Sequence, residues 1–131
     1  MKGLPFLFFA VAAICGLIGM AWGIQVSATG NHGMSPAHAH LNLLGWVTFS
    51  IFAFYYHLVP GAAEGMLPKL HLAVATLGLV IMIPGIAIAV SGGGEPMAAI
   101  GSLLSALSMV IFAVIVARNG LRGTAAQPAA A

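Results

Sequence analysis

Charged side chains are nearly missing from this sequence. Its 131 residues include no aspartate, and lysine, arginine and glutamate together supply only 5% of the chain. Soluble domains carry about a quarter charged residues, whereas 61% of the residues here are hydrophobic. Water is therefore excluded as the solvent for most of the surface, and lipid is expected instead. The net charge of +2 gives no indication of a nucleic-acid partner, and none is expected.

Cysteine is also scarce, since Cys15 is the single one and lies inside an apolar stretch. A lone cysteine forms no disulfide framework, so it indicates no redox compartment and is expected to be an apolar packing residue. The chain also lacks a set of hydroxyl, histidine and nearby carboxylate, because its two glutamates, Glu64 and Glu95, fall in connections. Hydrolysis by a catalytic triad is therefore disfavoured.

Long apolar stretches are what the sequence has in quantity. Each is close to the ~20 residues with which a helix crosses a hydrocarbon core of about 30 Å. The runs are unbroken rather than alternating, so helices are expected and barrel strands are not. The prediction is one all-α domain, residues 1–131: an integral membrane four-helix bundle with helices at about 5–24, 37–58, 70–90 and 97–117 and a disordered tail at about 123–131.

The first apolar stretch also has the general form of a signal peptide, because Lys2 precedes it. It is longer than the ~7–15 residues of a signal core. The segment Ala21-Trp22-Gly23 is also a weak cleavage site. A retained helix is therefore expected.

Positive charge predicts the orientation of the helices. With four spans, Lys2, Lys69, Arg118 and Arg122 all fall on one side, and the other side has no lysine or arginine. The positive-inside rule then places both termini and the middle connection in the cytoplasm. The expected location is a cell inner membrane, crossed several times, with the connection 26–36 on the outer side.

Five histidines carry most of the chemistry, and His38 and His40 are the most informative. Ser35-Pro36 is typical of a helix N-cap followed by a first-position proline, which places both histidines in the opening turns of the second helix. Residues two apart on a helix point ~200° away from each other. The two imidazoles therefore address different flanks, which suits a flat cofactor on each side and not a tetrahedral zinc site. The alternative is that they are solvated residues at a helix end.

The other three histidines have weaker signals. His32 lies near Met34 in the outer connection, and imidazole with thioether is a set that copper accepts, or else His32 is a solvated loop residue. His57 ends the second helix about 25 Å from His40, so the two cannot share a site. His71 opens the third helix on the same side as His57. The alternatives for this pair are interfacial residues, a shared cytoplasmic-side site, or a quinone or proton contact.

Small residues recur on the first and fourth helices. In lipid they allow helix backbones to approach closely, either within one chain or between chains. They are Gly16, Gly19 and Gly23 on the first helix, and Gly101, Ser102, Ser105, Ala106 and Ser108 on the fourth.

The segment Ser35-Pro36-Ala37-His38-Ala39-His40-Leu41-Asn42-Leu43-Leu44-Gly45-Trp46 resembles the second transmembrane helix of subunit I in the haem-copper oxidase and nitric oxide reductase superfamily. In that family a histidine followed by x-Asn-Leu-Leu and a tryptophan supplies an axial ligand to the low-spin haem. His40, Asn42, Leu43, Leu44 and Trp46 match that pattern. The pair His38-Ala39-His40 also has the form of the family's His-x-His, in which each histidine serves one of two haems.

The resemblance implies a homotrimer. The family's subunit has twelve helices in three arcs of four, so a four-helix chain looks like one arc and three copies would rebuild the architecture. It implies b-type haem near the outer face, with iron held by His40 of one chain and His38 of the next, and with hydrogen bonds from Asn42 and Trp46. The implied function is electron transfer or binding of oxygen or nitric oxide, with an electron donor or a respiratory complex as the partner on the outer side.

The departures from the family narrow that function. The third helix has no outer histidine for a copper site, the family's tyrosine–histidine cross-link is absent, and no acidic proton channel is present. An oxidoreductase is consistent with the remaining pattern, whereas oxygen reduction with proton pumping is not expected and a copper centre lacks support. Two alternatives remain: a cofactor-free accessory or assembly subunit of a respiratory membrane complex, and a small metal or proton transporter. The absence of intramembrane acids argues against the transporter.

Overall fold

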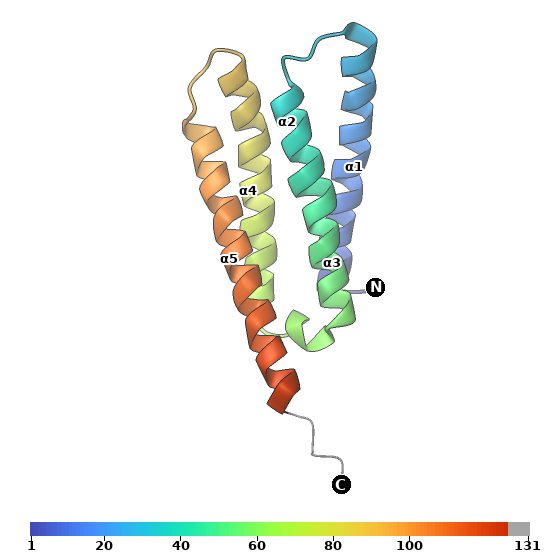
Figure 1. Ribbon diagram of the computed structural model, residues 1–131, viewed down its shortest axis with the longest axis vertical. Coiled ribbons are helices and arrows are strands. Elements are labelled where there is room, and N and C mark those ends of the chain that lie inside the picture. The colour runs from blue at the N-terminus through green and yellow to red at the C-terminus, as the bar shows by residue number, and fades with distance from the viewer. Residues whose placement is uncertain (126–131) are drawn as a thin grey trace.

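Four long apolar helices lie side by side in the computed structural model, which describes residues 1–125 and the side chains of residues 1–119 (Figure 1). All four are long and apolar enough to cross a membrane, which confirms the helical bundle expected from the sequence and indicates a multi-pass membrane protein. The elements are α1 (Leu4–Thr29), a second span made of α2 (Ser35–His40), η1 (Leu41–Thr48) and α3 (Phe49–Leu58), the short helix η2 (Pro60–Ala63), α4 (Leu67–Val90) and α5 (Pro96–Ala125).

Several helix ends differ from the predicted ones. α1 continues to Thr29, where Gly30 closes it in the left-handed conformation with φ 64°, so the outer connection is shorter than the predicted segment 26–36. Ser35 is not the N-cap of the second span: it is the first helical residue, follows Met34, and makes no side-chain capping bond. α5 runs on to Ala125, so most of the predicted tail lies outside the described residues.

The second span contains a wide-turned stretch, the π-helix η1. Its inward residues repeat every fourth position, at Ala37, Leu41, Gly45 and Phe49, all of which are buried. In an α-helix each step of four over-rotates by about 40°, so three steps would carry the row about 120° around the helix. The wider i→i+5 turn keeps these residues on one face. The Thr48 hydroxyl donates to the Leu43 carbonyl, five residues earlier, at 2.8 Å.

Small residues bring the helices close together within one chain. A Cβ atom added to Gly16 would lie 2.8 Å from the Trp46 ring, and one added to Gly101 would lie 2.5 Å from the backbone of Met82. Lipid tails are as apolar as the side chains, so packing and dispersion rather than the hydrophobic effect hold such contacts together. The glycine row of α1 thus serves the interior of the chain.

An aromatic cluster ties all four spans together at the end where the chain begins. Phe8 of α1, Phe52 and Tyr56 of α3, and His71 of α4 are fully buried side chains. Phe112 of α5 completes the cluster, with its ring centroid 4.5 Å from that of Phe52. The five rings fix how α1, α3, α4 and α5 meet.

The two ends of the bundle differ in charge. In Figure 1, α3 finishes and α4 begins at one end of the bundle. The positions of Lys2, Lys69 and Arg118 along their helices place them at this same end. At the opposite end the turn between α4 and α5 carries Glu95. α5 packs along α4 and has little contact with α1. Much of its apolar surface, including Leu103 and Val110, is therefore exposed on a single chain.

Candidate functional site

His40 lies on the outside of the second span with one ring nitrogen engaged. Its Nδ1 is 2.7 Å from the carbonyl oxygen of Pro36, one turn earlier. A carbonyl only accepts hydrogen bonds, so Nδ1 carries the proton and Nε2 presents a free lone pair. Metal-bound histidines have this arrangement, because the second hydrogen bond fixes the tautomer and the ring orientation. The His40 side chain is exposed, so its ring is accessible from outside the chain.

His38 lies on a different flank, against α1. Its ring centroid is 6.1 Å from that of Trp22, in an edge-to-face arrangement. A Cβ atom added to Gly23 would lie 3.3 Å from its Cε1 atom, so the absence of a side chain at Gly23 makes room for the ring. His38 is half-buried, and the two histidines address separate surroundings.

Asn42 and Trp46 stand in the same row as His38, one and two turns further along. The Asn42 amide donates to the His38 carbonyl at 2.9 Å, and its nitrogen lies 3.4 Å from both ring nitrogens of His38. The Asn42 side chain packs over Gly19, and the Trp46 ring packs over Gly16. The structure therefore groups both residues with His38 between the second span and α1, rather than beside His40.

The remaining predicted ligands are scattered. His32 is exposed in the outer connection, and Met34 lines a small hollow with Trp22. Within the described part of the chain, no three histidine, cysteine, aspartate or glutamate side chains gather to hold a metal ion. His57 is exposed at the end of α3, whereas His71 is fully enclosed, so the structure does not bring these two together.

His71 instead pairs with Tyr56, which the sequence analysis missed. The Tyr56 hydroxyl and His71 Nδ1 are 2.8 Å apart across the α3–α4 interface. His71 Nε2 is buried without a hydrogen-bond partner among the described residues. The rings of Phe8, Phe52 and Phe112 surround the imidazole with centroids 4.5–5.6 Å away. The available signal was an ionisable residue inside an apolar run, which is costly in a membrane.

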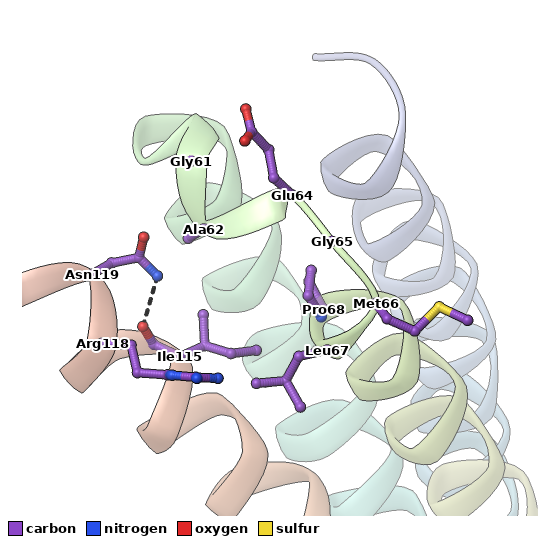
Figure 2. A pocket seen from close by; sticks show the side chains of 10 residues that line it. All are labelled: Gly61, Ala62, Glu64, Gly65, Met66, Leu67, Pro68, Ile115, Arg118 and Asn119. Carbon is purple, nitrogen blue, oxygen red and sulfur yellow. Dashed lines mark hydrogen bonds between the residues drawn. The ribbon is translucent and has the colours of Figure 1, made fainter. Parts of the chain in front are cut away.

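A polar pocket of about 240 Å³ opens at the end of the bundle that carries Lys2 and Lys69 (Figure 2). Its walls come from η2, the connection to α4, the first residues of α4, and Ile115, Arg118 and Asn119 of α5. The sequence analysis did not anticipate it, because its walls meet only when α5 folds back beside α4.

Comparison with family models, curated proteins and solved structures finds no match to this chain. The chemistry of its residues is therefore the basis for a functional proposal. His40 has the chemistry that a haem iron requires, because its Nε2 makes no hydrogen bond and its side chain is exposed. A haem held there would lie against the outer surface of the second span, and a second protein surface would have to cover it.

Proposed function

We propose that this chain is a membrane-bound b-type haem protein in which His40 is an axial ligand. The observation that carries the proposal is the hydrogen bond of 2.7 Å from His40 Nδ1 to the Pro36 carbonyl, which leaves Nε2 free on an exposed side chain. The wide-turned segment η1 begins at the next residue. Such segments are rare and are frequent at functional sites.

The proposed second surface is another copy of the chain, in a homotrimer with twelve helices. Apolar side chains on the second span are exposed on a single chain, including Leu43, Val47 and Ile51, and a haem macrocycle or a neighbouring helix would cover them. His38 of the neighbouring copy would be the second histidine that holds the iron. Its ring would then have to leave the contact with Trp22 and Gly23.

The residues of the chain hold and tune the site. A haem held by both histidines would supply one-electron transfer, and a haem held by His40 alone would bind oxygen or nitric oxide. The Pro36 carbonyl fixes the orientation of the His40 ring, and Asn42 braces the backbone that presents His38. In the proposed orientation both termini are cytoplasmic, the membrane is a cell inner membrane, and the site faces an electron donor on the outer side.

Absorption spectra of the purified protein, oxidised and reduced, test the proposal. We expect a Soret band that shifts on reduction, and we expect His40→Ala to remove most of the bound haem. His57→Ala is the matched control, because His57 is an exposed histidine at the other end of the same span. A colourless wild-type preparation after growth with added haem, or unchanged haem content in His40→Ala, contradicts the proposal.

The mass of the detergent-solubilised particle tests the trimer separately. We expect three chains per particle. We also expect the reduced spectrum of the His38→Ala variant to differ from that of the wild-type trimer. A monomer that retains haem would rule out the ligand from a second copy. A colourless chain that co-purifies with subunits of a respiratory complex would support the accessory role, which the exposed apolar face of α5 also suits.

A further inference from the structure

The polar pocket at the charged end of the bundle is separate from the histidine site. Gly61 and Ala62 form one wall, and Leu67 and Pro68 form another. Across from them stands the end of α5, with Ile115, Arg118 and Asn119 (Figure 2). The pocket thus combines apolar side chains on one side with a cationic side chain on the other.

Arg118 is the cationic group of this wall, and no hydrogen bond or ion pair joins it to another side chain in the described part of the chain. Glu64 also lines the pocket, but Figure 2 shows its carboxylate pointing away from the guanidinium. Asn119 uses one amide hydrogen on the Ile115 carbonyl at 2.8 Å. Among the described residues, its second amide hydrogen and the guanidinium donors of Arg118 have no partner, so they can bind an anion.

The position of the pocket along the helices suits a lipid headgroup. Arg118 directly follows the apolar stretch of α5, and Leu67 is the first residue of the α4 span. Both therefore lie where hydrocarbon gives way to headgroups, the level at which arginine extends to phosphate. Leu67, Pro68 and Ile115 give the pocket an apolar side that suits the glycerol and first acyl carbons of a phospholipid.

We propose that this pocket binds the phosphate of an anionic phospholipid, with Arg118 as the principal ligand and Asn119 as a second donor. A guanidinium matches phosphate oxygens in a bidentate manner. Basic pockets between transmembrane helices take anionic headgroups in this way. Glu64 limits the negative charge of the headgroup that the pocket can accept, because its carboxylate at the rim repels headgroups of higher negative charge.

Lipid titration of the purified protein, followed by native mass spectrometry, tests the proposal. The probes are phosphatidylglycerol, phosphatidylcholine and inorganic phosphate. We expect phosphatidylglycerol to bind more tightly than phosphatidylcholine. We expect Arg118→Gln to weaken phosphatidylglycerol binding about fivefold, the effect of one basic residue near the membrane surface. Arg118→Lys should retain part of the affinity, because it keeps the charge and loses the bidentate geometry.

Two further variants complete the test. Lys2→Gln is the matched control, since Lys2 is a cation at the same end that does not line the pocket, and it should leave affinity unchanged. Glu64→Gln should strengthen binding by removing negative charge from the rim. Equal affinity in Arg118→Gln, or no preference over phosphatidylcholine, overturns the site. Competition by inorganic phosphate at the concentrations at which the lipid binds overturns the lipid as its ligand.

Discussion

At the scale of single residues, the pair Tyr56–His71 is the main departure from an apolar interior. One tautomer of the pair leaves fewer groups unpaired than the other. If Tyr56 donates to Nδ1, only the Nε2–H lacks a partner, and the surrounding ring faces can accept it weakly. If Nδ1 carries the proton instead, both the tyrosine O–H and the Nε2 lone pair lack a hydrogen-bond partner. Tyr56 is therefore the donor in the observed bond of 2.8 Å.

This assignment predicts an unequal response to substitution. Tyr56→Phe leaves a buried imidazole with no partner for either nitrogen, and we expect a loss of stability of about 1–3 kcal/mol. Tyr56→Phe combined with His71→Leu removes both polar partners and should recover most of that loss. Unfolding of the purified protein in detergent measures both changes.

Tyr55→Phe is the control for this pair, because Tyr55 is half-buried and makes no side-chain hydrogen bond in the described part of the chain. It should leave the unfolding midpoint unchanged. If the double variant is as unstable as Tyr56→Phe alone, the pair stabilises the protein through the packing of its rings rather than through its hydrogen bond.

How far the sequence predicted individual residues depended on whether their partners were close along the chain. The different flanks of His38 and His40 follow from the rotation of one helix. Tyr56 and His71 belong to different spans, and nothing in the local sequence shows that those faces meet. The haem-ligand roles of His38 and His40 stay a prediction.

At the scale of elements, the contact between α1 and the second span depends on residues without side chains. Gly16, Gly19 and Gly23 of α1 face Trp46, Asn42 and His38, respectively. These three side chains are four residues apart, and they share one face because η1 is wound more widely than an α-helix. The glycine row was recognised in the sequence, but its partners were not, because the wide turn was not foreseen.

Gly19→Ala should separate these two helices. Its Cβ atom would overlap the Asn42 side chain, and overpacking of this kind typically destabilises a protein by about 1–3 kcal/mol. We also expect it to alter the surroundings of His38, since Asn42 contacts both. Thermal unfolding in detergent measures the first effect, and the spectrum of the proposed haem measures the second.

Gly61→Ala is the matched glycine control. An added Cβ atom there would lie 4.0 Å from the nearest side chain, so no loss of stability is expected. Equal stability of Gly19→Ala and the wild type would show that Asn42 moves aside freely and does not brace the contact.

At the scale of the whole molecule, the distribution of charge predicts how the bundle sits in the membrane. Cysteine variants at Glu95 and Met66 report on opposite ends, because both side chains are exposed. A membrane-impermeant maleimide should label Glu95→Cys in intact spheroplasts, and Met66→Cys only after permeabilisation. The native Cys15 is buried and should add little background. The reverse labelling pattern would contradict cytoplasmic termini.

The overall architecture was the most predictable level. Four apolar runs separated by proline and glycine were enough to find four helices, because the hydrocarbon core requires backbone hydrogen bonds to be satisfied within each span. Their ends were less predictable: α1 continues through polar residues to Thr29, where apolar content no longer marks the helix. The polar pocket could not be predicted, since it depends on how closely α5 approaches η2.

The wide-turned segment also affects how the chain tolerates changes in length. A stretch with i→i+5 bonding holds about one residue more than an α-helix needs for the same rotation. Deleting a single residue within Leu41–Thr48 would therefore let the span close into a regular α-helix, with the helices before and after it in nearly the same orientation. The same deletion in the α-helical part of α4 would turn everything beyond it by about 100°. Single-residue deletions are thus expected to be tolerated within Leu41–Thr48, which follows the two histidines, and poorly tolerated elsewhere in the spans.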